Sequence, residues 1–143
     1  IDKSLRYWDA GFSIALGIFC KDSQNLIGTV NIFNFSKESK RAEIKYMLNP
    51  QYWGLGIMTE TLTALFNYVF ETMNLNRLEA TIDPRDKASS MLLKNMGFNK
   101  QDALLKKECI VKGIASESKN YGISKKEYLK QIQKSTITSR RKE

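Results

Sequence analysis

The sequence predicts an α/β sandwich whose mixed sheet is antiparallel at its start and parallel across a helical crossover. Three observations support this prediction. Two largely apolar segments, 12–20 and 26–35, flank a polar five-residue turn, as in a hairpin. The segment 41–48 alternates in polarity, and helical periodicity follows it. A second strand and helix follow from residue 77, so the order favours one sheet with helical crossovers.

Each element follows from residue spacing. Alternation over 41–48 places Ala42, Ile44, Tyr46 and Leu48 on one face of a strand. After Gly56, apolar residues recur at three- and four-residue steps as far as Met73, which predicts one core-facing helical stripe. A short strand is expected over 77–83, a weaker one over about 101–111, and a last one near 118–124.

The second helix has a clear start and end. Asp86 is suited to cap its N-terminus, and Gly97 is suited to follow its C-terminus with Phe98 as the apolar contact beyond. We expect its buried face to consist of Ala88, Met91, Leu92 and Met96.

The length of 143 residues predicts one domain, which we place at residues 1–125 with a helical end at residues 1–8. Residues 126–143 are predicted to be a basic tail, helical in part over about 126–133. Residues 125–143 hold seven Lys and Arg residues against two Glu, a net +5 of the chain's +8. Such a tail is either solvated or a contact for nucleic acid or the ribosome, and we expect the solvated state.

The composition excludes several classes of protein. No histidine is present, which excludes a Ser-His-Asp triad and a His-ligated metal site, and we expect no metal. Neither a phosphate-binding P-loop nor a Gly-x-Gly-x-x-Gly turn after the first strand is found. The longest apolar run is too short to span a bilayer, and the two distant cysteines fit reduced thiols, so we expect a cytoplasmic protein without membrane contact.

The stretch 43–59 dominates the functional prediction. It comprises a strand, a turn at Pro50, a loop with Gly54 and Gly56, and the start of a helix. Glycines allow close approach to the main chain, and the N-terminus of a helix attracts anions. We therefore expect a phosphate-bearing ligand at residues 51–59.

At Gln51-Tyr52-Trp53-Gly54-Leu55-Gly56 the sequence resembles the Gln/Arg-x-x-Gly-x-Gly/Ala loop of the GNAT N-acetyltransferases. Matches at 42–48, 53–60, 77–80, 83–84, 88–89 and 97–98 are similar to the branch that acetylates ribosomal-protein N-termini. The resemblance implies a mostly antiparallel twisted sheet flanked by helices. It also implies that the family's opening strand and two helices are missing or truncated here.

The resemblance further implies that acetyl-CoA is the co-substrate and an amine the acceptor; a homodimer is compatible with it. The residues that it places against acetyl-CoA are Met47, Leu48, Gln51, Trp53, Gly54, Leu55, Gly56, Ile57, Met58, Thr59, Asp86 and Ser89. Two departures stand out: Asp86 replaces the usual Asn, and Leu55 stands where a basic residue is common.

Acetyl transfer to an amine needs an oxyanion donor, a base and a proton for the thiolate. We expect a backbone N–H near Met47 or Leu48 to be the donor and either Glu43 or Glu79 to be the base through water. Each carboxylate could equally be held in an ion pair. The expected proton donor is Ser89, with Tyr121 as the alternative.

The predicted function is therefore acetyl transfer from acetyl-CoA to a primary amine, a protein N-terminus or a small amine, by direct attack in a ternary complex. The alternative is a non-catalytic module of the same fold that uses its basic tail to bind RNA or the ribosome.

Overall fold

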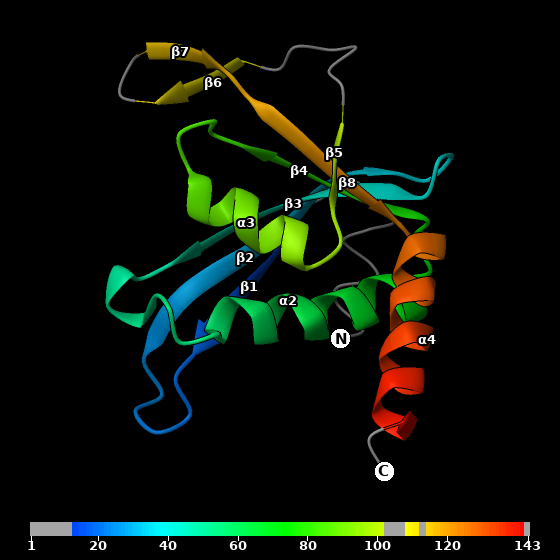
Figure 1. Cartoon of the computed structure of the whole chain (residues 1–143). Coiled ribbons are helices and arrows are strands. Elements are labelled where there is room, and N and C mark those ends of the chain that lie inside the picture. The colour runs from blue at the N-terminus through cyan, green and yellow to red at the C-terminus, as the bar shows by residue number, and fades with distance from the viewer. Residues whose placement is uncertain (1–12, 102–107, 112–113, 142–143) are drawn as a thin grey trace.

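The computed structural model describes residues 13–101, 108–111 and 114–141 (Figure 1). The predicted helical end at residues 1–8 lies outside the described residues. The strands are β1 (Ile14–Phe19), β2 (Leu26–Ser36), β3 (Arg41–Leu48), β4 (Arg77–Ile82), β5 (Asn99–Gln101), β6 (Glu108–Val111), β7 (Ile114–Glu117) and β8 (Lys119–Ser124). The helices are η1 (Pro50–Tyr52), α2 (Ile57–Asn67), η2 (Tyr68–Thr72), α3 (Lys87–Asn95) and α4 (Lys125–Arg141).

The main sheet has six strands in the order β1-β2-β3-β4-β8-β5. β1 and β2 form the predicted hairpin, and β2 pairs with β3 antiparallel. β3 pairs with β4 in parallel, which requires the crossover through α2. The remaining pairs, β4 with β8 and β5 with β8, are antiparallel, so the predicted mixed, mostly antiparallel sheet is confirmed.

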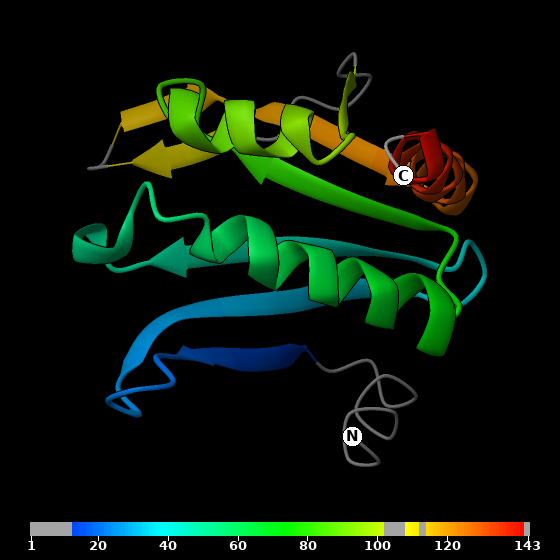
Figure 2. The same ribbon diagram turned by 60° about the horizontal axis from the view of Figure 1, so that its bottom comes forward.

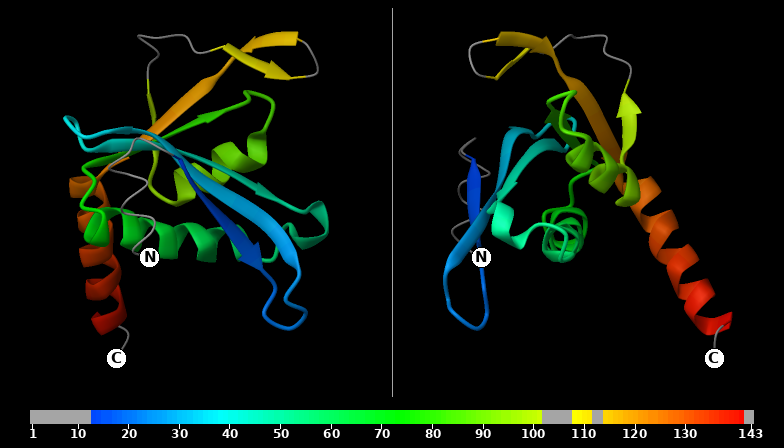
Figure 3. Two further views of the ribbon diagram at one scale, coloured as in Figure 1. Left: turned by 180° about the vertical axis from the view of Figure 1, so that it is seen from behind. Right: turned by 60° about the vertical axis from the view of Figure 1, so that its left-hand side comes forward.

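α2 and α3 both cover the same face of the sheet (Figure 2). The alternating residues of β3 and β4 explain why, since Ala42, Ile44, Leu78 and Ala80 are buried on that side. Of the described helices, none crosses the opposite face when the molecule is seen from behind (Figure 3, left). One face of the sheet therefore carries the core and the other carries polar side chains of β3 and β4.

The stripe predicted for the first helix is confirmed as core. It is buried along its whole length, from α2 through the π-helical segment η2, and consists of Leu62, Leu65, Phe66, Val69, Phe70 and Met73. The chain leaves this helix at Asn74, whose φ of 55° lies in the left-handed region that asparagine tolerates better than most residues. The helix therefore ends without a glycine.

The caps of α3 are confirmed, but its predicted buried face is wrong. The Asp86 side chain accepts a hydrogen bond from Ser89 N, and Gly97 has a φ of 94°. The buried residues of α3 are Ser90 and Leu93. Met91 is 61% exposed, Ala88 is exposed, and Leu92 and Met96 are half-buried. The helix is thus rotated relative to the expected face, and the reason appears at the pocket described below.

Of the strand expected over about 101–111, residues 102–107 lie outside the described residues, and its two described ends belong to different sheets. Asn99–Gln101 joins the main sheet as β5 beside β8. Glu108–Val111 pairs instead with β7 in a separate two-stranded sheet. The last strand, predicted near 118–124, is confirmed as β8.

α4 is longer than the helix expected near 126–133, because it continues to Arg141. Its first turn belongs to the domain. Lys125 N donates to Asn76 O at 2.8 Å, Glu127 Oε2 accepts from Ser124 N at 2.8 Å, and Tyr128 is buried against Phe66 and Phe70. The rest of the helix extends away from the sheet (Figure 3, right). The boundary at residue 125 stays a prediction, and these contacts argue for placing it after Tyr128.

None of the helices in the described part of the chain combines the length and apolar character needed to cross a membrane.

Candidate active site

The site begins where β3 and β4 separate. Their ladder runs from Arg41–Arg77 to Ile44–Ala80 and stops there, although β3 continues to Leu48 beside β2. Asn49 N donates to Ile27 O at 2.8 Å, and hydrogen-bonded residues alternate along an antiparallel ladder. The main-chain groups of Met47 therefore face β2. Those of Leu48 face the gap left by β4.

The loop after β3 turns the chain into α2 through two glycines in the left-handed region. Gly54 has a φ of 74° and Gly56 a φ of 77°, and a Cβ at either position would have no heavy atom within 4 Å. Gly56 is the N-cap of α2, and no side chain caps its first turn. No side chain therefore occupies the amides of this turn, and the predicted phosphate site at residues 51–59 stays a prediction.

Trp53 connects the loop to the separated strand edge. Its indole Nε1 donates to Leu48 O at 2.8 Å, although 64% of the residue remains exposed. This bond satisfies the Leu48 carbonyl. The Leu48 N–H faces the gap beyond the end of the β3–β4 ladder and is a suitable donor to a carbonyl oxygen that becomes anionic.

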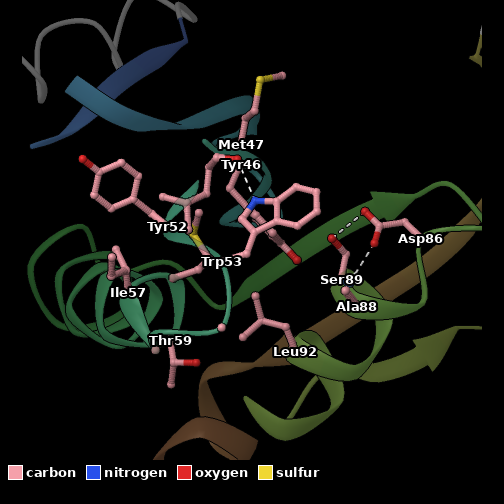
Figure 4. A pocket seen from close by; sticks show the side chains of 14 residues that line it. Tyr46, Met47, Tyr52, Trp53, Ile57, Thr59, Asp86, Ala88, Ser89 and Leu92 are labelled. Carbon is pink, nitrogen blue, oxygen red and sulfur yellow. Dashed lines mark hydrogen bonds between the residues drawn. The ribbon is translucent and has the colours of Figure 1, made fainter. Parts of the chain in front are cut away.

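A pocket of about 600 Å³ joins these features between β3, α2 and α3 (Figure 4). Its lining comprises Tyr46, Met47, Leu48, Tyr52, Trp53, Gly54, Gly56, Ile57, Met58, Thr59, Asp86, Ala88, Ser89 and Leu92. Ten of the residues predicted to contact acetyl-CoA are in this set. Gln51 and Leu55 lie in the same loop but do not line the pocket.

The pocket also explains the rotation of α3. Ala88 and Leu92 line the cavity, where Ala88 is exposed and Leu92 is half-buried between the cavity and the core. Leu93, one residue on, packs into the core with no exposed surface. Apolar residues at helical spacing can thus line a ligand site as well as a core.

Asp86 and Ser89 form one hydrogen-bonded unit at the start of α3. Asp86 Oδ1 accepts from Ser89 N at 3.0 Å, and Asp86 Oδ2 accepts from Ser89 Oγ at 2.7 Å (Figure 4). The Ser89 proton is therefore engaged with a carboxylate. The preceding turn is held by Arg85, whose guanidinium and amide both bond Asp83 and keep the pKa of that carboxyl below its usual value.

Tyr46 lines the pocket, although the alternation of its strand predicted only which face it shares with Ala42, Ile44 and Leu48. Its hydroxyl points into the pocket between Trp53 and Ser89 (Figure 4). Burial raises the pKa of Tyr46 to about 12; the nearby Ser89 hydroxyl opposes that rise and the Asp86 charge adds to it. The buried Tyr46 hydroxyl oxygen has no other hydrogen-bond partner among the described residues. Strand alternation alone could not predict that the Tyr46 side chain lines a pocket.

The two candidate bases lie on the sheet face that the described helices leave uncovered. Glu43 and Glu79 are register partners on β3 and β4. Glu79 forms ion pairs with Arg77 at 3.0 Å and Arg41 at 3.8 Å, whereas neither glutamate lines the pocket. Glu43 precedes Tyr46 by three residues, about 10 Å along the strand. Bridging water molecules would have to connect the Glu43 carboxylate to the gap between β3 and β4.

Tyr121 does not belong to the pocket. It lies on β8 opposite Ala80 and is only 1% exposed within the hydrophobic core. Over the described residues there is also no group of three or more Asp, Glu or Cys side chains arranged to hold a metal ion.

This architecture has a known counterpart. Residues 2–99 match the acetyltransferase (GNAT) domain. The chain belongs to the GNAT acetyltransferase family. This GNAT chain is 34% identical over 111 residues to p20, an uncharacterised N-acetyltransferase of Bacillus licheniformis, with 78% of the chain and 62% of p20 aligned. It is 33% identical over 92 residues to the ribosomal protein uS5-alanine N-acetyltransferase of Escherichia coli, of which it covers 47%. The chain thus spans about half to three fifths of these relatives.

Solved GNAT structures share the fold. The ribosomal-protein-S5-alanine acetyltransferase of Vibrio fischeri superimposes with a TM-score of 0.75 at 23% identity, over 88% of this GNAT chain and 69% of the other. The spermidine/spermine N-acetyltransferase SpeG of Vibrio cholerae gives a TM-score of 0.77 at 18% identity, over 91% and 74% of the two chains. Identities this low establish the common architecture and leave the substrate to be argued from the site.

Proposed function

We propose that this GNAT chain transfers the acetyl group of acetyl-CoA to a primary amine, by direct attack in a ternary complex in the cytoplasm. The observation that carries the proposal is the single pocket that joins the α2 N-terminus to the separated edge of β3. One end suits a pyrophosphate and the other a thioester carbonyl, which are the two ends of acetyl-CoA.

The main chain would hold the pyrophosphate. No Lys or Arg is among the described residues that line the pocket, and Asp86 is the one charged residue there. The anion would therefore be bound by the amides of residues 54–59 and by the α2 dipole. The side chain at position 55 should therefore matter little, since Leu55 is 68% exposed and is not among the residues that line the pocket.

At the other end, the Leu48 N–H would stabilise the carbonyl oxygen as it becomes anionic. Met47 is less suitable, because its main chain faces β2. The amine would approach from the uncovered face, where Glu43 or Glu79 would accept its proton through water. Relatives are named for acetylating alanine of a ribosomal protein and spermidine, which supports an amine as acceptor.

The test combines binding and turnover. Free CoA at a concentration of about 100 times its Kd should stabilise the protein by about 2.7 kcal/mol, visible as a rise in the melting temperature. A thiol-release assay over a panel of amines and N-terminal peptides should then show release that depends on one class of acceptor. Absence of thermal protection at saturating CoA would contradict the proposal.

Separate changes of the two carboxylates should identify the base. We expect Glu43→Gln to lower kcat by about 10²-fold or more, the range seen for loss of general-base catalysis. Glu79→Gln should stay within about tenfold, because the Glu79 carboxylate is held by Arg77 at 3.0 Å and Arg41 at 3.8 Å and would have to leave these partners to accept a proton through water. Steady-state kinetics with the best amine give both values, and a larger loss for Glu79→Gln would reverse the assignment.

One observation favours a second candidate function, RNA binding by α4. Lys126, Lys130 and Lys134 follow at four-residue steps, so like charges stand side by side along one face. The described part of α4 carries six cations and the single acid Glu127, which already bonds Ser124 and Asn99. Bound phosphates would relieve this repulsion.

RNA binding is testable without removing the anchored first turn of α4. The triple change Lys126→Gln, Lys130→Gln and Lys134→Gln should reduce the slope of log affinity against log salt by about 2, as expected for three lost phosphate contacts to a single strand. Mobility shifts with a single-stranded RNA at several salt concentrations measure the slope. An unchanged slope, or no binding by the parent protein, would exclude this candidate.

A further inference from the structure

The pairing of β3 with β4 arranges side chains in rows across the uncovered face of the sheet, from which the acceptor would approach (Figure 3, left). The last complete row holds Glu43 and Glu79. One step further along the strands, Lys45 and Thr81 stand on either side of the gap, because the ladder has ended there. Thr81 pairs with Asn120 on β8. Lys45, Thr81 and Asn120 form a gap row, which borders the opening on the uncovered face.

The gap row offers hydrogen-bond donors. Thr81 Oγ1 donates to Asn120 Oδ1 at 3.1 Å, which occupies the amide oxygen and leaves Asn120 Nδ2 as a donor. Lys45 is exposed, and its ammonium group forms no ion pair or hydrogen bond with a described residue. A lysine ammonium has three donors and no acceptor. A group that approaches the gap row should therefore supply oxygen atoms that accept hydrogen bonds.

The charges on this face also favour an anion beside the gap. On β3 and β4 the face carries the cations Arg41, Lys45 and Arg77 and the carboxylates Glu43 and Glu79. Glu79 already pairs with Arg77 at 3.0 Å and with Arg41 at 3.8 Å. Glu43 is two residues from Lys45, about 7 Å along the strand. An ammonium group is therefore attracted toward Glu43, whereas Lys45 attracts an anion and repels a second ammonium group.

We propose that the acceptor amine also carries a carboxylate, which Lys45 and Asn120 bind while the amine nitrogen attacks the thioester at the gap. The inference rests on the proposed function and narrows its acceptor to one chemical class. Lys45 and Asn120 determine specificity and take no part in moving the proton. Two sources share this chemistry: a peptide N-terminus followed by an acidic residue, and a small amine with a free carboxylate. A polyamine, which lacks the carboxylate, is disfavoured.

The experiment measures kcat and KM for acetylation of matched acceptors at low salt. One set consists of peptides that begin with alanine, carry Glu, Gln or Lys at the second position, and end in an amide. The other set consists of alanylglycine with a free carboxylate and the same dipeptide as its amide. Spermidine serves as the polyamine. The peptide set tests a side-chain carboxylate, and the dipeptide set tests a free carboxylate on a small amine.

The variants are Lys45→Glu, Lys45→Gln and Asn120→Asp. Asn120→Asp keeps an oxygen that can accept from Thr81 and removes the donor. Lys100→Glu is the matched control, because Lys100 is exposed on β5 of the same sheet but pairs with Tyr121, which places it on the opposite face. None of the substituted residues lines the pocket, so CoA should protect every variant thermally as it protects the parent protein.

We expect the parent protein to prefer the Glu peptide over the Lys peptide about tenfold in kcat/KM, the change from attraction to repulsion at a partly exposed charge. The preference should come from KM and should shrink as salt is added. Lys45→Gln should reduce it to about twofold, and Lys45→Glu should reverse it. Asn120→Asp should also weaken it, whereas Lys100→Glu should keep the preference of the parent protein. A preference for the free dipeptide over its amide, without one among the peptides, would identify the small amine as the source.

Two results would overturn the inference and leave the proposed function intact. One is turnover by the parent protein that ignores the carboxylate in both sets or is fastest with spermidine. The other is a preference that Lys45→Glu retains, or that Lys100→Glu changes as much as Lys45→Glu does, since the net charge of the protein would then explain it. Failure of the parent protein to bind CoA, or to acetylate any of these amines, would instead overturn the proposed function, and this inference with it.

Discussion

Gly56→Val should abolish thermal protection by CoA while leaving the protein folded. Gly56 combines a φ of 77° with open space where a Cβ would project, at the N-cap of α2. A β-branched residue there costs about 1–2 kcal/mol of backbone strain, which a domain of this size tolerates. The added side chain would occupy the space in front of the amides, and we expect CoA affinity to fall at least about 100-fold.

Strain and obstruction can be separated at the same position. Asparagine tolerates the left-handed region, so Gly56→Asn should melt close to the parent protein. Its side chain still projects into the anion site, and CoA protection should be lost again. Differential scanning fluorimetry with and without CoA checks both variants, and protection retained by Gly56→Asn would show that conformation alone matters at this position.

Tyr128→Ala should be the most destabilising change near the C-terminus, by about 3–5 kcal/mol, the range for removing a buried aromatic side chain. Tyr128 is 8% exposed, stacks on Phe70 with ring centroids 4.9 Å apart, and meets Phe66 edge-on. Its hydroxyl also donates to Asn67 Oδ1. Urea unfolding should show the loss as a lower midpoint with little change in slope.

Two controls define that result. Ile137→Ala, on the same helix but 56% exposed, should stay within about 0.5 kcal/mol. Tyr128→Phe keeps the ring stacking and should cost only about 1 kcal/mol for the lost hydrogen bond. If Tyr128→Ala were as mild as Ile137→Ala, the first turn of α4 would not belong to the cooperative domain.

The sequence predicted the elements whose periodicity reflects burial on one side. β3 and the stripe from Leu62 to Met73 show this, because each has one buried face and one solvent face. The predicted buried face of α3 and the predicted strand over 101–111 were wrong, because burial in a single core does not determine these two segments. Ala88 and Leu92 line the pocket, and the segment around 101–111 divides between two sheets.

The site was predictable where function depends on the main chain. Gly54 and Gly56 indicate a left-handed loop before a helix, and this local pattern in the sequence is enough to predict the loop. Tyr46 was not predictable as a site residue, because its role depends on α3 bringing Ser89 and Asp86 opposite β3. Likewise, Arg41 reaches Glu79 only through the parallel pairing of β3 with β4, whereas Arg77 is on the same strand as Glu79.

The indole of Trp53 gives the pocket an optical reporter of its own. It lines the cavity, is largely solvent-exposed, and is held in place by the bond from Nε1 to Leu48 O. Trp8 is the other tryptophan of the chain. Trp8→Phe would therefore leave a single fluorophore, and its emission would report pocket occupancy at the point where loop and strand meet.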